Sequence, residues 1–184
     1  MKNSPQKYNF WLATILIIAV LIFRVISNQL FIYNFTPVIA VALFAGSKLK
    51  DEKYAVLLPI VCLFISDVVL SFLNNFNILH GTLFFTYGAL LLIFVLGRFL
   101  QKDGINFSQT ALYSILSSIL FFVLTNFGVW LLGNMYAHNI KGLIECYTLA
   151  IPFNKITWIG DLIYVFGLFG VYQWFSVKST VATR

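Results

Sequence analysis

Long apolar runs separated by short polar segments constrain this chain more than any other feature. A helix that crosses a bilayer needs roughly 20 mostly apolar residues. Five such runs are present: 8–26, 54–73, 81–100, 110–132 and 156–175. Charged residues make up 10% of the chain, against about 25% in a soluble domain. The sequence therefore predicts an all-α integral membrane protein with one domain over residues 1–184, and it excludes an ordinary water-exposed globule.

A sixth apolar run, 35–47, is short for a membrane span. It begins with Thr36-Pro37, and proline suits a first helical turn because its missing N–H would be unpaired there anyway. Lys48 and Lys50 follow the run and can snorkel to the interface, and burial among neighbouring helices would compensate for the missing length. We therefore expect six spans in all, with a re-entrant hairpin as the open alternative for this run.

The distribution of Lys and Arg gives an independent test of six spans. With the N-terminus in the cytoplasm, nine basic residues fall on the cytoplasmic side: Lys2, Lys7, Lys48, Lys50, Lys53, Arg98, Lys102, Lys178 and Arg184. Three fall outside: Arg24, Lys141 and Lys155. This bias favours a multi-pass protein of the cell inner membrane with both termini in the cytoplasm. It also accounts for the net charge of +6, so no nucleic-acid partner is implied.

The first apolar run resembles a signal peptide because Lys2 and Lys7 precede it. The run is too long for the apolar core of such a peptide, and no A-x-A-like cleavage site follows it. We expect a retained membrane helix.

Polar residues inside the apolar runs, or directly beside them, are the main functional signal, because such residues are costly in a membrane. On the expected topology five of them lie at one depth, in the outer half of the bilayer: Arg24, Asn34 (just before its run), Asp67, Asn126 and Asp161. Charged groups in hydrocarbon usually face a bundle interior or water. The layer therefore predicts a polar cavity that opens to the outside.

Each of these residues also has a purely structural interpretation. Arg24 can snorkel to lipid headgroups, or it can pair with Asp67 or Asp161. Asn126 can bond a neighbouring helix, which is worth about 0.6 kcal/mol on average in one membrane protein.

The segment 133–155 is expected to be external, and its part 142–153 is apolar but too short to span. We expect it to lie over the outer mouth as a lid that carries Glu145, Cys146 and Tyr147. An ordinary interfacial segment is the alternative. Trp130 and Tyr147 would serve as aromatic walls of the site, and Cys146 has no assigned role.

Motifs of familiar catalytic chemistry are missing from the chain. It has no H-E-x-x-H, no Walker A sequence and no G-x-S-x-G elbow. The two cysteines fit no zinc spacing. We expect no enzyme, no bound metal and no cofactor. An intramembrane enzyme that uses Asp67 and Asp161 as acid and base stays open as a remote alternative, because it needs both carboxyl groups near one reacting group.

Several sequence blocks carry a resemblance to a known family. They are Asn34-Phe35-Thr36-Pro37 with Ala42 to Gly46, Ser66-Asp67, Thr125 to Trp130, Gly142 to Tyr147 with Ala150 to Phe153, and Gly160-Asp161. The chain resembles a bacterial six-helix family of uncharacterised transport proteins. That family is in turn similar to the substrate-binding (S) components of energy-coupling factor vitamin transporters.

The resemblance implies a six-helix bundle that binds a vitamin, a cofactor precursor or a metal ion near its outer face. It also implies a transmembrane coupling subunit with ATPases as partner. S components often present an A-x-x-x-A face on the first helix. Ala13 and Ala19 do not match that spacing, and Ala42-x-x-x-Gly46 is the small-residue face that this chain offers.

We therefore expect a substrate-binding membrane protein for uptake of a small solute. The alternative from another class is a structural or assembly membrane protein, whose polar layer ties its helices together without a ligand. The solute-binding hypothesis predicts that Asp67→Asn or Asp161→Asn abolishes binding in a folded protein. The structural alternative predicts that these substitutions lower thermal stability.

Overall fold

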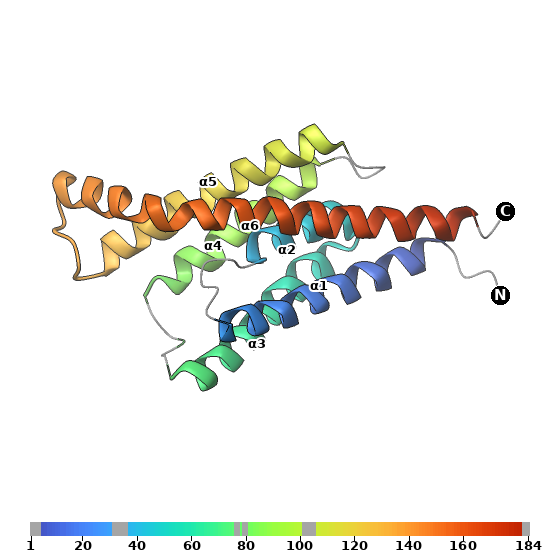
Figure 1. The fold of residues 1–184 in the computed structure, drawn as a ribbon, viewed down its shortest axis with the longest axis horizontal. Helices are drawn as coiled ribbons and strands as arrows, with labels where there is room; N and C mark the ends of the chain where they lie inside the picture. The colour runs from blue at the N-terminus through green and yellow to red at the C-terminus, as the bar shows by residue number, and fades with distance from the viewer. Residues whose placement is uncertain (1–4, 31–36, 76–77, 79–80, 101–105, 182–184) are drawn as a thin grey trace.

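The computed structural model describes residues 5–30, 37–75, 78, 81–100 and 106–181, with side chains between residues 10 and 175. In these ranges the chain forms six α-helices (Figure 1): α1 (Pro5–Gln29), α2 (Val38–Lys48), α3 (Glu52–Asn74), α4 (Leu83–Phe99), α5 (Phe107–Leu132) and α6 (Ile140–Val181). The all-helical fold is confirmed for the part of the chain that the structure describes. Each of the six apolar runs has a helix.

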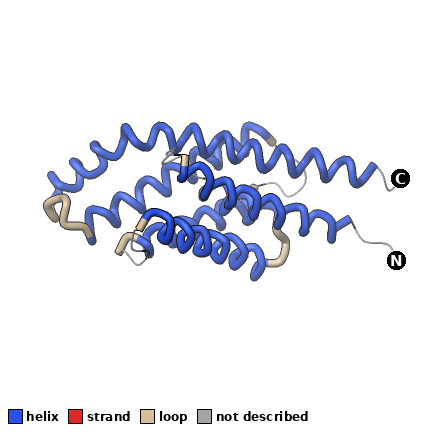
Figure 2. Tube along the Cα trace, turned by 60° about the horizontal axis from the view of Figure 1, so that its bottom comes forward, coloured by secondary structure: helices blue, strands red, loops and turns tan. Residues whose placement is uncertain are grey.

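The helices lie along the longest axis of the molecule, and both ends of the chain lie at the same end of it (Figures 1 and 2). The opposite end is formed by the hairpin in which α5 turns into α6. The long helix α6 runs along almost the whole molecule.

Four helices are long and apolar enough to cross a membrane: those within 10–29, 52–74, 107–132 and 140–175. The apolar helices α2 and α4 are shorter. Large apolar side chains are exposed on α1, α3, α4, α5 and α6, for example Ile22, Phe72, Phe84 and Ile159. A surface of this kind is stable in lipid, because hydrocarbon tails replace the contacts that a soluble protein would need.

The short helix α2 is the centre of the bundle. All residues from Val38 to Ser47 are buried, and α2 packs against α4 and α6 and also contacts α1, α3 and α5. Its 11 residues extend about 16 Å at 1.5 Å per residue, which is about half of a bilayer core. Burial among neighbours was expected to compensate for this shortness, and that burial is found.

Two glycines bring α2 and α4 into backbone contact. A methyl group built on Gly46 would collide with the carbonyl oxygen of Phe94, and it would lie 3.1 Å from the Cα atom of Gly97. A methyl group on Gly97 would in turn collide with the carbonyl oxygen of Leu43. The small-residue face that includes Ala42 and Gly46 is therefore occupied inside the bundle.

The helix that contains the last apolar run begins before that run, inside the segment 133–155 that is expected to be external. Residues from Ile140 onward already belong to α6, which continues without a break to Val181. Pro152 lies inside this helix, and helices in membrane proteins tolerate proline because neighbouring groups satisfy the freed carbonyl. The part expected to form a separate lid is thus the first third of a 42-residue helix, about 63 Å long.

Side-chain caps determine where two helices begin. The Asp51 carboxylate accepts hydrogen bonds from the backbone N–H groups of Lys53 and Tyr54 at the start of α3. The Asn106 side chain accepts one from the N–H of Gln109 at the start of α5. Such caps satisfy N–H groups that have no partner within the helix.

Candidate functional site

An ion pair connects the first and third helices. The Arg24 guanidinium donates to Asp67 Oδ1 at 2.6 Å and also bonds the Ser66 hydroxyl. From α4, the Tyr87 hydroxyl donates to Asp67 Oδ2 at 2.8 Å. The side chains of Arg24 and Asp67 are 15% and 23% exposed. Of the two structural alternatives given for Arg24, the structure shows pairing, and the partner is Asp67.

This ion pair lines a small cavity of about 260 Å³. Most of its other lining side chains are apolar, and they come from α2, α3, α4 and α5: Val38, Leu63, Leu83, Leu90 and Phe121. Each charge already has its counter-charge and a hydroxyl partner, and the buried Nε atom of Arg24 is a donor that lacks a partner among the described residues.

A larger cavity of about 630 Å³ lies between α5 and the first half of α6. Its polar lining comes from Thr125, Asn126, Tyr136, Asn154 and Thr157, and its aromatic walls are Phe121, Phe122 and Phe153. None of its lining residues is charged. Phe121 also lines the smaller cavity, so one side chain is shared by both.

The polar side chains of the α5–α6 cavity differ in how they are bonded. Asn126 donates from Nδ2 to the carbonyl of Phe122 at 2.8 Å. Its amide oxygen therefore remains available to accept a hydrogen bond from a ligand. The buried Nδ2 atom of Asn154 has no hydrogen-bond partner among the described residues. Buried polar atoms are usually paired, so this amide indicates a place where a bound molecule or water completes the hydrogen bonding.

Asp161 lies in a third environment, between α6 and α5. It is 0% exposed, and its Oδ2 atom lies 2.6 Å from the hydroxyl oxygen of Ser118. Its Oδ1 atom has no partner among the described residues, and neither have the buried hydroxyls of Ser114 and Ser117. Asp161 does not line either cavity described above.

The expected single polar layer is therefore divided among three places. Arg24 and Asp67 meet at the small cavity, Asn126 lines the α5–α6 cavity, and Asp161 is buried against Ser118. Asn34 lies outside the described residues. The two carboxyl groups needed by the enzyme alternative thus belong to different clusters.

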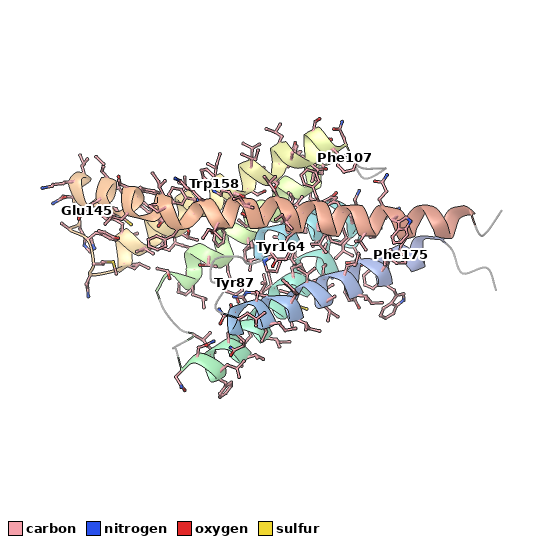
Figure 3. All side chains as sticks on the ribbon, viewed as in Figure 1. Tyr87, Phe107, Glu145, Trp158, Tyr164 and Phe175 are labelled. Carbon is pink, nitrogen blue, oxygen red and sulfur yellow. The ribbon has the colours of Figure 1, made fainter. Side chains whose placement is uncertain are left out.

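The residues expected in the lid and its walls have other positions. The Trp130 indole donates to the carbonyl of Ala137 at 3.0 Å and contacts His138, which closes the turn between α5 and α6. The Tyr147 hydroxyl donates to the carbonyl of Val123 at 2.7 Å. Glu145 is exposed near the start of α6, at the end opposite the termini (Figure 3). These three residues support or flank the α5–α6 cavity and do not line it.

Cys146, to which the sequence assigns no role, lines the α5–α6 cavity. Its buried thiol lies 3.5 Å from the carbonyl oxygen of Asn126. The thiol therefore belongs to the wall of the cavity.

Sequence reasoning missed Asn154 and Thr157, although a spacing signal points to them. Cys146, Ala150, Asn154, Thr157 and Asp161 recur every three or four residues, which places them on one face of a helix. On α5 the buried residues Thr110, Ser114, Ser117 and Ser118 do the same. The stripe on α6 crosses the expected boundary at residue 156, and so it is visible only when 140–181 is treated as one helix.

The fold and its apolar surface are those of a multi-pass helical membrane protein. The chain belongs to a family of unknown function, DUF6580, whose model matches residues 4–182. Neither a curated protein nor a solved structure matches the chain significantly.

Proposed function

We propose that the protein is a membrane-embedded solute-binding protein that takes up a small, uncharged organic solute in the α5–α6 cavity. The observation that carries the proposal is the unpartnered buried amide of Asn154 in a cavity of about 630 Å³. Ligand pockets typically measure 300–1,000 Å³ and combine apolar walls with a few placed polar groups. The lining meets that description with amides, hydroxyls and phenyl rings.

The class of solute follows from this lining. Asn126 and Asn154 offer an amide oxygen and an amide N–H, which match a ligand that both donates and accepts hydrogen bonds. Phe121, Phe122 and Phe153 supply apolar surface against which a planar ring stacks well. A charged ligand would lose its hydration without gaining a counter-charge from the lining residues.

The membrane topology is part of the proposal: six spans in a bacterial inner membrane with both termini in the cytoplasm. Support comes from the shared end of the two termini (Figure 1) and from the nine basic residues expected on that side. Near the same end, Trp11, Tyr54 and Trp174 are exposed, as is typical of an aromatic belt at a membrane interface.

Likeness to the S components of energy-coupling factor transporters also remains a proposal. It rests on the sequence blocks given above and on the six-helix order. A coupling subunit with ATPases would not dock on Ala42 and Gly46, because α2 is buried and α4 covers Gly46.

A structural role is supported for one part of the molecule, the cluster of Arg24, Ser66, Asp67 and Tyr87. Its side chains bond one another and connect α1, α3 and α4, although the buried Nε atom of Arg24 has no partner among the described residues. The expected loss of binding in Asp67→Asn is therefore replaced by an expected loss of stability, and the ligand test moves to the α5–α6 cavity.

Native mass spectrometry of the gently purified protein tests the proposed site. A bound solute should appear as a defined mass adduct in the wild type and weaken or disappear in Asn126→Leu and Ala150→Phe. The first variant removes a hydrogen-bonding amide, worth about tenfold or more in affinity, and the second places a phenyl ring in the cavity. Thr86→Val is the matched control, because Thr86 lines only the smaller of the two cavities.

An adduct that persists in both cavity variants, or that Thr86→Val removes equally, would contradict the α5–α6 site. Where the wild type carries no adduct, a panel of uncharged metabolites is screened by thermal unfolding. A ligand at 100 times its Kd stabilises by about 2.7 kcal/mol. Failure of the whole panel to raise the melting temperature would favour the structural alternative.

A further inference from the structure

The hydroxyl of Ser118 lies within hydrogen-bond distance of two acceptors. Its Oγ atom lies 2.6 Å from Asp161 Oδ2 and 3.0 Å from the carbonyl oxygen of Ser114. A hydroxyl group has one proton to donate, and a backbone carbonyl can only accept. A single hydroxyl proton would have to be shared between the two acceptors in a three-centre bond. Each contact is a full hydrogen bond with its own proton when the carboxyl group is protonated, because it then donates to Ser118 while Ser118 donates to Ser114.

The surroundings of Asp161 favour the same protonation state. The residue is 0% exposed and its Oδ1 atom has no partner among the described residues. An ionised carboxylate in such a place loses its hydration without compensation, whereas the neutral acid loses far less. α5, the helix that carries its hydrogen-bond partner, contains no Lys, Arg or His.

The charged groups that the structure describes on α1 and α2, two helices that pack against α6, make their contacts elsewhere. Arg24 on α1 is bonded to Ser66 and Asp67. Lys48 on α2 lies over the ring of Phe169, eight residues beyond Asp161 and so about 12 Å farther along α6. Tyr113 is the titratable side chain of α5, and on α6 Tyr164 packs edge-on against Phe23 of α1.

The proposed solute cavity begins one helical turn from this carboxyl group. Thr157 lines the cavity and precedes Asp161 by four residues, and Phe122 lines it and follows Ser118 by four residues. Residues at this spacing are neighbours on a helix face. Water that entered the cavity would therefore lie about one helical turn from a proton that leaves Asp161.

We propose that Asp161 is a proton-binding site linked to the α5–α6 cavity. In the conformation seen here its carboxyl group holds the proton in the bond to Ser118. On release, the Oδ2–H bond breaks and the proton passes to water in the cavity, which leaves a carboxylate that needs hydration. The linkage rests on the proposed function of the cavity.

Infrared spectroscopy of the protein in lipid nanodiscs tests the proton directly. The chain has six Asp and Glu residues, and carboxyl groups in water are ionised at pH 7. The wild type should therefore show the carbonyl band of a protonated carboxylic acid at pH 7. Asp161→Asn should lose this band, and Glu145→Gln, at an exposed position, should keep it. A wild type without the band, or a band that survives Asp161→Asn, would overturn the proposal.

Two further measurements separate a bound proton from a folding defect and from a bound metal cation. Ser118→Ala retains Asp161 and should shift the band in frequency, because the bond to Ser118 is lost; it serves where Asp161→Asn fails to fold. Replacing choline chloride by NaCl should leave the band unchanged, and its disappearance in Na⁺ would show a metal cation in place of the proton.

A separate measurement tests whether proton release from Asp161 is linked to the α5–α6 cavity. Ala150→Phe fills the cavity and excludes water, so a smaller fraction of the band should be lost at a fixed alkaline pH than in the wild type. An unchanged fraction would overturn the linkage. None of these measurements uses a solute, so failure of the proton site and failure of the solute site are distinguishable.

Discussion

Replacing Asp67 by alanine is expected to lower the free energy of unfolding by at most about 3–5 kcal/mol, which is the cost of breaking a fully buried ion pair by removing one partner, because this pair is only partly buried. The variant leaves the Arg24 guanidinium, 15% exposed, with Ser66 as its remaining partner and without a counter-charge. Tyr87 loses the acceptor of its hydroxyl proton at the same time. Arg24→Ala should cost a similar amount, because it leaves the carboxylate without its counter-charge.

The double variant Arg24→Ala/Asp67→Ala separates pairing from simple truncation. It leaves no uncompensated charge, so its loss of stability should be clearly smaller than the sum of the two single losses. The measurement is reversible unfolding of all variants in one detergent, with Glu145→Ala as an exposed control. Additive single effects would show that the two charges act independently and would contradict a structural role for the pair.

These results would also decide what the cluster does. Loss of stability with an unchanged mass adduct assigns Arg24 and Asp67 to holding α1, α3 and α4 together. Loss of the adduct without loss of stability would return the binding site to the charged residues, as the sequence alone suggested.

The lengths of the apolar runs predicted well where helices occur, but they predicted less accurately where each helix begins and ends. The runs 54–73, 81–100 and 110–132 lie within a few residues of α3, α4 and α5, because hydrophobicity over 20 residues is a strong signal. The last run was expected to begin at 156, and α6 begins at Ile140. Lys141, Glu145 and Lys155 lower the hydropathy of this part, but their side chains do not interrupt the backbone hydrogen bonds of a helix.

The expected topology is consistent with the contact of Arg24 and Asp67, but it does not predict which polar residues share a site. It places Arg24 and Asp67 at one level, and the two side chains form an ion pair. The same reasoning says nothing about which face of a helix a residue occupies relative to its neighbours. Asp161 faces the serines of α5, and Asn126 faces the α5–α6 cavity, so residues expected at one depth divide among separate clusters.

Alanine at Gly46 should destabilise the bundle by about 1–3 kcal/mol, the usual cost of overpacking. Its methyl group meets the backbone carbonyl of Phe94, which has no rotamer to change, so α2 and α4 must separate. Gly88→Ala on α4 is the matched control, since a methyl group there meets nothing within 4 Å. The control should be neutral or stabilised by up to about 1 kcal/mol, because alanine favours helix.

The comparison of these two glycine variants also tests the coupling-subunit proposal. If Gly46 serves internal packing, Gly46→Ala lowers the melting temperature of the isolated protein, and Gly97→Ala does the same because its methyl group meets the carbonyl of Leu43. A Gly46→Ala protein as stable as Gly88→Ala would contradict the α2–α4 contact. If this stable Gly46→Ala protein also lost a co-purifying membrane subunit, the small-residue face would be a docking site for that partner. In that case α2 would have to reach the surface of the bundle when the partner binds.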